Sequence, residues 1–543
     1  MAVQDPDQRV LELQSLYDGP AVCLAELLCD QYPDDAIAYR VVAADLSVTT
    51  YTYGALRLAS TQFAQALVTQ GISSGDRVAT LMGKGWAFLV AVMGIWRLGA
   101  VHVPLFTAFA PPAIAMRLSR SATRLVVVDA SQRDKLNDPE ISVLSALTVV
   151  SVADSQANDL AFWPLVNGAP AEALQTPLRG DAPMIEIYTS GTTGNPKGVV
   201  VPIKAVAAFR AYAEFGFDLR PDDVFWNAAD PGWAYGLYLG VLATLSTGTP
   251  AVMLEGGFDA QRTLQVLSRL GVTNFAAAPT VYRALLSAEG EVPSGMMIRC
   301  ASSAGEPLTP EINEWAEANL GVTVHDHYGQ TEGGMMINNH HHPSVAAPVK
   351  PGAMGRSMPG WRAAVLDNER DEEVAAGVVG RIVIDCTRSP LSWFAGYVDD
   401  PEKTAERYSA DGRWYLTGDT GYVDESGDFH FSSRDDDLIL MAGYRIGPFE
   451  IESVLVQHPA VVESAVIAVP DTLRGEVIES FVVLAEGVTG NEALVAELQQ
   501  WVKKRFAAHA YPRVIHFVEA LPKTPSGKIQ RFQLKKQRIA ELA

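Results

Sequence analysis

Apolar positions in the first half of the chain alternate between helical and strand-like spacing. After Thr52-Tyr53-Gly54 they recur every three or four residues as far as Gly71, which predicts an amphipathic helix. Residues 77–82 then form a short, largely apolar run, which predicts a buried strand. The same two patterns, helical spacing and short apolar runs, recur at 88–98, 124–129, 205–215, 251–254, 263–271 and 274–278. This alternation predicts a layered α/β domain with largely buried strands.

Two stretches interrupt the alternation. Residues 10–30 carry two short amphipathic patterns separated by Gly19-Pro20, which predict a helical entry segment. Residues 131–180 are rich in Asp, Ser, Ala, Asn and Pro and show few periodic signals. We therefore expect a variable connection between 131 and 180.

The pattern changes again after Gly418-Asp419. A Gly/Asp-rich run leads to residues 432–437, and short strand and helix patterns then continue to the end of the chain. They predict strands near 465–469 and 480–484, a helix near 491–506 and a basic helix after Arg531. We therefore predict a large N-terminal domain, residues 1–435, and a small α+β C-terminal domain, residues 436–543.

Composition narrows the range of partners and locations. The 543 residues carry a net charge of −21, which argues against nucleic acid or an anionic membrane as a general partner. Four cysteines without a close pair suggest a reducing compartment. The first residues lack the features of a signal peptide, and no long uncharged apolar run occurs. We expect a cytoplasmic protein without membrane insertion, either a monomer or a homodimer.

A Gly- and Thr-rich segment at residues 188–198 lies between two apolar runs. Its glycines allow close backbone approach, its hydroxyls can donate to oxygens, and its lysine supplies positive charge, a combination suited to a polyphosphate. A Walker-type loop is excluded because Pro196 precedes the lysine and Gly198 follows it. The candidate phosphate ligands are Thr189, Ser190, Gly191, Thr192, Thr193, Gly194 and Lys197.

Further polar segments have the composition of site-forming loops. Residues 302–307 and 326–332 each place polar groups and a glycine after a short apolar stretch. Residues 415–419 read Tyr-Leu-Thr-Gly-Asp, and residues 522–528 form a Pro/Gly turn that ends in a lysine. Taken alone, Glu332 would be a solvated surface acid and Lys528 an exposed lysine in a turn.

Taken together, these segments resemble the adenylate-forming superfamily of acyl-CoA synthetases, luciferases and peptide-synthetase adenylation domains. The resemblance covers about residues 50 to 533, with all motifs in family order. It is closest to acetyl-CoA and medium-chain acyl-CoA synthetases, judged by residues 230–233, Asp-Pro-Gly-Trp, and by residues 443–450. It implies a large layered α/β domain followed by a small mobile α+β domain.

The resemblance implies nucleotide-binding roles in the large domain. It implies that Tyr328 stacks on the base, that Thr331 contacts the α-phosphate and that Glu332 is the Mg²⁺ carboxylate. Asp419 would accept both ribose hydroxyls, and Arg434 would add a second ribose contact. The remaining nucleotide-binding candidates are Gly305, Glu306, Pro307, Asp326, His327, Gly329 and Gln330.

The resemblance also implies a mobile C-terminal domain. Lys528 would bridge the attacking carboxylate and the α-phosphate, where it stabilises charge that develops in the transition state. Asp436 would be the hinge. After rotation, Gly443 would lie beside the pantetheine channel and Arg445 near the phosphates.

The implied reaction has two steps. A carboxylate and MgATP give acyl-AMP and pyrophosphate, and the CoA thiol then displaces AMP. In acetyl-CoA synthetases a tryptophan precedes Gln-Thr-Glu; here Gly329 stands there, so we expect a deeper pocket with Trp233 and Tyr235 as candidate walls. This favours a short-to-medium-chain, branched or aryl acid over acetate.

Three alternatives remain open at this point. The enzyme could pass the acyl group to a carrier protein, could be an acetate- or propionate-specific CoA ligase, or could be a non-catalytic AMP-binding protein. A metal site at His340-His341-His342 is disfavoured, because adjacent histidines do not readily face one ion and no acidic or cysteine partner is close in sequence. We predict a surface loop there.

Overall fold

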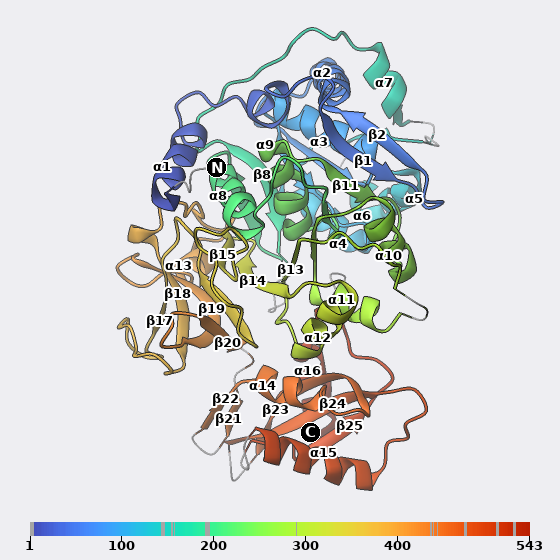
Figure 1. Cartoon of the computed structure of the whole chain (residues 1–543). Coiled ribbons are helices and arrows are strands. Elements are labelled where there is room, and N and C mark those ends of the chain that lie inside the picture. Colours follow the sequence, from blue (N-terminus) through green and yellow to red (C-terminus); the bar gives the residue numbers. More distant parts are fainter. Residues whose placement is uncertain are drawn as a thin grey trace.

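The computed structural model describes most of the chain (Figure 1). The described residues are 5–542 without 143–146, 154–155, 157, 190–195, 289, 291, 435–436, 438, 442–443, 472–474, 507–509 and 525–527. For residues 142, 440, 444, 445 and 475 the backbone alone is described.

Two sheets lie at the centre of the large N-terminal part. The first has the order β7-β6-β5-β3-β4-β8-β9 and is parallel except for the antiparallel β8–β9 pair. Its strands are β3 (Arg77–Leu81), β4 (Val101–Pro104), β5 (Leu125–Val128), β6 (Thr148–Ser151), β7 (Leu160–Ala161), β8 (Pro183–Tyr188) and β9 (Gly198–Pro202). The antiparallel pair brackets the predicted phosphate loop, so that segment connects two strands as expected.

The second sheet runs β17-β18-β19-β20-β16-β15-β14-β13-β12-β10-β11-β1-β2. Strands β10 to β14 pair in parallel, whereas the half from β14 to β20 is antiparallel. The members are β1 (Ile37–Val42), β2 (Val48–Thr52), β10 (Phe225–Asn227), β11 (Ala251–Leu254), β12 (Asn274–Ala277), β13 (Cys300–Ala304), β14 (Val324–Gln330), β15 (Gly334–Asn338), β16 (Ala353–Ser357), β17 (Ala363–Leu366), β18 (Gly380–Asp385), β19 (Trp414–Val423) and β20 (Phe429–Arg434).

Helices cover these sheets and bury their apolar faces. The helix α3 (Trp86–Leu98) is buried on nearly all sides and packs against α2 (Tyr53–Thr69) in the main core. The other helical segments before residue 435 are α1 (Pro6–Tyr17), η1 (Glu26–Asp30), α4 (Pro111–Arg120), α5 (Ala130–Arg133), η2 (Asp134–Asn137), α6 (Pro139–Ser142), α7 (Phe162–Gly168), α8 (Ala205–Ala211), η3 (Tyr212–Gly216), η4 (Tyr235–Leu242), α9 (Ala243–Thr247), α10 (Ala260–Arg269), α11 (Pro279–Leu286), α12 (Pro310–Asn319), η5 (Cys386–Arg388) and α13 (Pro401–Ala405).

The C-terminal part, orange to red in Figure 1, has its own sheet and core. The sheet order is β22-β21-β24-β23, with β25 added in parallel to β24. Its elements are β21 (Ile439–Met441), β22 (Tyr444–Ile446), α14 (Pro448–Leu455), β23 (Val461–Asp471), β24 (Gly475–Leu484), α15 (Glu492–Arg505), β25 (Val514–Phe517) and α16 (Arg531–Leu542). This small α+β unit follows the large α/β unit, so the predicted fold class is confirmed.

Element predictions were accurate where the hydrophobic period was strong. The predicted helix after Thr52 is α2 and the predicted strand at 77–82 is β3. The prediction of a variable connection at 131–180 was wrong, because β6, β7 and α7 form within this stretch. The two strands are short and only partly buried, so no long hydrophobic period marks them. The predicted boundary at 435–436 falls outside the described residues, between the end of β20 and the start of β21, and stays a prediction.

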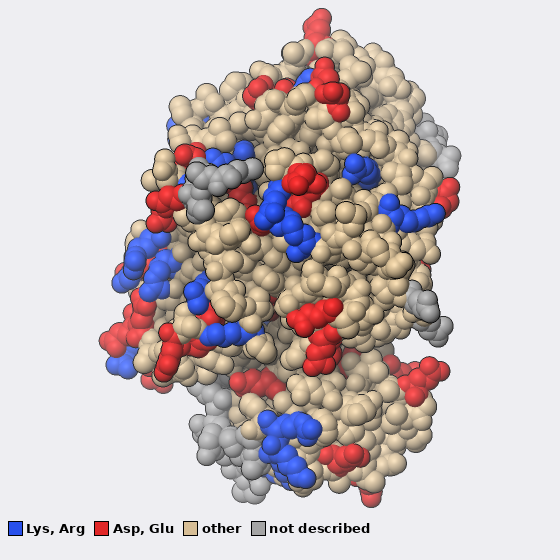
Figure 2. Space-filling view, in the orientation of Figure 1, with Lys and Arg blue, Asp and Glu red and all other residues tan. Residues whose placement is uncertain are grey.

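The surface charge, the apolarity of the helices and the state of the cysteines complete the description. On the face shown in Figure 2, lysine and arginine side chains form small groups interspersed with aspartate and glutamate. None of the helices that the structure describes has the length and apolarity needed to span a bilayer. The cysteines, Cys23, Cys29, Cys300 and Cys386, are all free thiols.

Candidate functional site

The candidate site begins where the parallel strands β13 and β14 end. Gly305-Glu306-Pro307 follows β13, and Thr331-Glu332 follows β14. Carboxyl ends of neighbouring parallel strands meet at one edge of a sheet, where α/β proteins commonly bind ligands. Gly305 has a φ of +102°, and a Cβ there would lie 3.2 Å from the Trp233 ring. The turn after β13 therefore requires glycine and brings the Gly-Glu-Pro loop against Trp233.

Asp419, the predicted ribose ligand, is held by two side chains from β14. The Tyr328 hydroxyl and Gln330 Nε2 donate to its Oδ2 at 2.5 and 2.8 Å, and Gln330 is itself held by the Tyr415 hydroxyl. Arg434 Nε lies 3.8 Å from Oδ1. Burial raises the pKa of Asp419, and Arg434 opposes that rise. The structure thus brings Tyr328, Asp419 and Arg434 together and fixes one carboxylate oxygen.

Glu332, the predicted Mg²⁺ carboxylate, lies next to Lys197 at the other end of the site. The Tyr397 hydroxyl donates to Glu332 Oε1 at 2.6 Å, and Lys197 Nζ lies 4.9 Å from the centre of the Tyr397 ring. Arg407 Nε donates to the Tyr397 hydroxyl at 3.0 Å. Burial lowers the pKa of Lys197, and the Arg407 charge lowers it further. Two cations and one carboxylate therefore surround a single tyrosine.

Lys528 reaches this constellation from the C-terminal unit. Its Nζ lies 5.6 Å from the centre of the Trp233 ring, while its backbone N–H donates to Thr524 Oγ1. Burial lowers the pKa of the Lys528 ammonium, whereas the nearby carboxylates of Glu306, Asp419 and Glu332 oppose that change. The lysine is thus directed toward the N-terminal site residues.

Glu306 has a partner that the sequence did not suggest. Arg283, on α11, donates from Nη2 to Glu306 Oε2 at 2.7 Å. This ion pair orients the carboxylate that opposes the pKa shift of Lys528 most strongly. Arg283 therefore links α11 to the loop after β13.

Several predicted residues cannot be placed. Ser190, Gly191, Thr192, Thr193, Gly194, Asp436 and Gly443 lie outside the described residues, and for Arg445 only the backbone in β22 is described. At the ends of the phosphate loop, the Thr189 backbone N–H donates to the Lys197 carbonyl at 2.9 Å, which extends the β8–β9 ladder. Pro307 and Thr331 lie in the described loops after their strands.

His327 and Asp326 need different interpretations from those expected. The His327 ring is buried, with Nδ1 bonded to the Tyr212 hydroxyl and Nε2 to the Asn339 carbonyl. A nucleotide-binding role for its side chain is therefore wrong, because both nitrogens are occupied inside the core. Asp326 is also buried and accepts a long bond from the Leu308 backbone. Burial raises the pKa of Asp326 to about 8, so this carboxyl is largely protonated at neutral pH.

The expectation that Gly329 opens a deeper acid pocket is also wrong. A Cβ at residue 329 would lie 2.0 Å from the Gly334 carbonyl oxygen, within the β14–β15 pair. The glycine therefore permits close approach of two backbones and leaves no side-chain volume for an acyl group. Tyr235 is 4% exposed and packs in the main core, whereas Trp233 is only partly buried and faces Gly305 and Lys528. Trp233 remains the better candidate wall.

The triple histidine is not a surface loop. His340 is 3% exposed, and the His341 ring stacks on His325 with centroids 3.7 Å apart. Nitrogen atoms of His325, His327 and His341 lie within 4.8 Å of one another. However, His325 Nδ1 and His327 Nε2 both bond the Asn339 carbonyl, which requires N–H donors rather than lone pairs. This pattern favours a packing role over a metal site.

The residues present fit a divalent cation at Glu332. Its carboxylate is a hard oxygen ligand, and the Tyr397 bond occupies Oε1 and fixes the orientation of the group. Tyr397 and Arg407 were missed by sequence reasoning, because Tyr397 is 65 residues from Glu332 and neither lies in a recognised motif. The isolated pair Gly396-Tyr397 carries no signal on its own.

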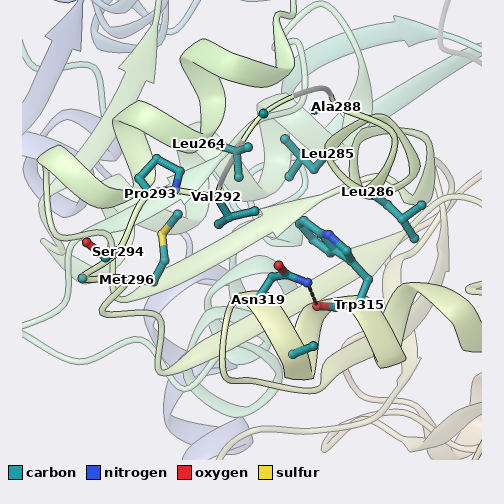
Figure 3. Close-up of a pocket in the computed structure, with 13 residues that line it drawn as sticks. Leu264, Leu285, Leu286, Ala288, Val292, Pro293, Ser294, Met296, Trp315 and Asn319 are labelled. Atoms are coloured by element: carbon teal, nitrogen blue, oxygen red, sulfur yellow. Dashed lines mark hydrogen bonds between the residues drawn. The ribbon is translucent and has the colours of Figure 1, made fainter.

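A cavity elsewhere has different chemistry. About 560 Å³ lies between α10, α11 and α12, lined mainly by apolar side chains together with two polar ones, Ser294 and Asn319 (Figure 3). No charged residue lines it among those the structure describes there. The described part of its lining therefore lacks the groups needed to bind a polyphosphate.

Comparisons with known proteins agree with this geometry. The AMP-binding enzyme family matches residues 26–398, and the AMP-binding enzyme C-terminal domain matches residues 450–528. Acetyl-coenzyme A synthetase of Bacillus subtilis (strain 168) is 34% identical over 495 residues, covering 89% of this chain and 84% of that protein.

Two solved structures extend the likeness to the whole fold. The crystal structure of Brucella canis acyl-CoA synthetase is 41% identical with a TM-score of 0.76, covering 100% of this chain and 98% of that one. A benzoate CoA ligase from Burkholderia xenovorans LB400 is 29% identical with a TM-score of 0.82, covering 97% and 99%.

Fold and site together define a two-part nucleotide-binding enzyme. The chain belongs to the AMP-binding enzyme family. The resemblance stated from the sequence and the expected ligase class, that of the acyl-CoA synthetases, are thereby confirmed.

Proposed function

We propose that this enzyme converts a carboxylic acid, ATP and CoA to acyl-CoA, AMP and pyrophosphate. The observation that carries the proposal is the approach of Lys528 to Trp233, near the carboxylates of Glu306, Asp419 and Glu332. A lysine delivered by one part of the chain to the nucleotide residues of another is suited to a reaction in which that lysine acts in one step only.

In the first step, a carboxylate oxygen attacks the α-phosphorus and the bond to pyrophosphate breaks. The Lys528 ammonium stabilises the negative charge that develops on the α-phosphate and the attacking oxygen. Lys197 offsets the charge of the departing pyrophosphate, and Asp419 and Tyr328 hold the nucleoside. When bound at Glu332, Mg²⁺ supplies charge neutralisation for the phosphates.

In the second step, the CoA sulfur attacks the acyl carbonyl carbon, the thiol proton leaves to solvent, and the bond to AMP breaks. Lys528 would leave the site for this step. The hinge at Asp436, the channel role of Gly443 and the phosphate role of Arg445 stay predictions.

We propose a short-to-medium-chain, branched or aryl acid as the substrate. Trp233 supports this class, because an indole beside the site offers an apolar wall for an alkyl or aryl group. The names of the relatives span acetyl-coenzyme A and benzoate-CoA synthesis, which supports a small acid without distinguishing its chain. A cytoplasmic location and the oligomeric state, monomer or homodimer, remain predictions.

The test measures two reactions over a panel of acetate, butyrate, isobutyrate, hexanoate and benzoate. We expect acid-dependent exchange of pyrophosphate into ATP without CoA, and AMP release at steady state only when CoA is added. Exchange that persists while CoA fails to release AMP would favour an acyl-carrier protein as acceptor. AMP binding without exchange for any acid would contradict an enzymatic role.

A further inference from the structure

One tyrosine outside the recognised motifs contacts both predicted phosphate-end groups. Tyr397 directs its hydroxyl at Glu332 Oε1, 2.6 Å away, and its ring face at Lys197 Nζ, 4.9 Å from the ring centre. Tyr397 is 6% exposed and Glu332 is 7% exposed. The Tyr397–Glu332 hydrogen bond is therefore shielded from water, and a shielded hydrogen bond to a charged group is strong.

Arg407 fixes the tyrosine in turn. Its Nε donates to the Tyr397 hydroxyl at 3.0 Å, while Nη1 donates to the Thr417 carbonyl at 3.0 Å. The guanidinium therefore spans from Tyr397 to β19, two residues before Asp419. With its oxygen accepting from Arg407, the hydroxyl proton points to Glu332.

We propose that Tyr397 and Arg407 are positioning residues, which orient the Glu332 carboxylate toward a divalent cation and hold Lys197 beside it. The pattern resembles that of outer-shell partners in metal sites, which orient a ligating carboxylate and set metal affinity without touching the ion. The proposal rests on the proposed function, because it assumes that a metal–nucleotide complex binds at Glu332.

Two substitutions of Tyr397 separate its two contacts. Tyr397→Phe removes the hydroxyl and keeps the ring face against Lys197, whereas Tyr397→Leu removes both. Tyr408→Phe is the matched control, because the Tyr408 hydroxyl donates to the Phe394 carbonyl at 2.7 Å and the residue is partly buried nearby in sequence. Its hydroxyl bonds Phe394, whereas the described contacts to Glu332 and Lys197 come from Tyr397.

The measured quantity is Mn²⁺ affinity, which is determined by electron paramagnetic resonance in the presence of the non-hydrolysable analogue α,β-methylene-ATP. Loss of an outer-shell partner typically weakens metal affinity about 10- to 100-fold. We expect a loss of this size for Tyr397→Phe, with little change in binding of the analogue in EDTA. Tyr397→Leu should in addition weaken pyrophosphate binding, because Lys197 loses its support.

Arg407 is tested by graded replacement. Arg407→Met should weaken Mn²⁺ affinity about as much as Tyr397→Phe, because the hydroxyl is then free to rotate away from Glu332. Arg407→Lys retains a donor and a charge, so we expect partial recovery. A simple effect on folding would lower the melting temperature of Arg407→Met and Arg407→Lys without this order in Mn²⁺ affinity.

Wild-type Mn²⁺ affinity in Tyr397→Phe, or an equal loss in Tyr408→Phe, would overturn the proposal. The measurement needs no turnover, so it is separate from acid-dependent pyrophosphate exchange by the wild-type enzyme. Exchange with unchanged Mn²⁺ affinity in the variants would refute the positioning role alone. Absence of exchange with every acid would instead refute the proposed function.

Discussion

Replacing Gly329 by alanine tests whether this residue shapes the acid pocket or the backbone. A Cβ at residue 329 would lie 2.0 Å from the Gly334 carbonyl oxygen and 2.8 Å from the Met335 Cα. Favourable contacts between such atoms begin above about 3 Å, so the strands must separate by roughly 1 Å. The oxygen belongs to the backbone of β15 and cannot turn aside as a side chain could.

The size of the effect follows from this movement. Overpacking of a closely packed site typically costs about 1–3 kcal/mol of folding stability, and more when backbone must shift. Because β14 also carries Tyr328 and Gln330 and leads into Glu332, the same shift would displace groups that we predict to bind the nucleotide. A displacement of about 1 Å can lower catalytic efficiency by about 100-fold.

The assay compares melting temperature and kcat/KM for acetate, butyrate, hexanoate and benzoate. We expect Gly329→Ala to lower the melting temperature and to reduce kcat/KM for all acids by a similar factor. Gly257→Ala is the control, because a Cβ there meets no atom within 4 Å and its φ is not in the left-handed region. An unchanged melting temperature together with selective loss of the longer acids would show that residue 329 does line the acyl pocket.

Three further predictions concern the charged groups. Lys528→Ala should slow acid-dependent pyrophosphate exchange by about 10²–10³-fold and spare thioester formation from supplied acyl-AMP, because only the first step needs the ammonium. The control is Lys523→Ala, because Lys523 pairs with Glu463. Equal loss in both half-reactions would refute the role of Lys528. Pyrophosphate exchange should also decline as the pH rises, and the decline should begin below pH 10.5, the ordinary pKa of lysine. Burial lowers the pKa of Lys528, so its neutral form dominates above that lowered pKa. A matching decline in the thioester half-reaction would contradict this assignment. Asp419→Asn should weaken ATP binding, measured by calorimetry, by about 10- to 100-fold, because it loses charge-assisted bonds to the ribose; wild-type affinity would exclude Asp419 as the ribose ligand.

The spacing of hydrophobic residues correctly predicted the elements that have a clear periodic pattern. The long period after Thr52 identified α2, and the apolar run from Arg77 identified β3. It did not identify β6 or β7, because these short strands lie within a stretch rich in Asp, Ser, Ala, Asn and Pro, and neither is buried along its whole length as β11 and β12 are. Nor could it show that β14 to β20 form an antiparallel extension of the same sheet, since strand pairing depends on contacts between distant segments.

The positions of candidate site residues were predicted best where neighbouring residues form one loop directly after a strand. Gly305 and Glu306 follow one strand directly, so their motif also fixes their position in space. His327 was misjudged because successive residues of a strand point to opposite faces, and its ring lies on the core side while Tyr328 faces Asp419. Gly329 was misjudged because the sequence records a missing side chain but not what occupies its place.

The local charges explain how an acidic protein could bind a polyanion at the proposed site. The net charge of −21 would repel ATP at long range, so attraction must be local and short-ranged. Three cations from separate segments lie near Glu332: Lys197, Arg407 and Lys528. The Glu332 carboxylate raises the pKa of each of them. Burial opposes the charged form of both lysines, and the phosphates of ATP would offset that cost more fully than one carboxylate can. After pyrophosphate departs, only the single phosphate charge of acyl-AMP would remain beside the Lys528 ammonium, so less of its burial cost would be offset. This gives a physical reason for the proposed departure of Lys528 before the CoA thiol enters.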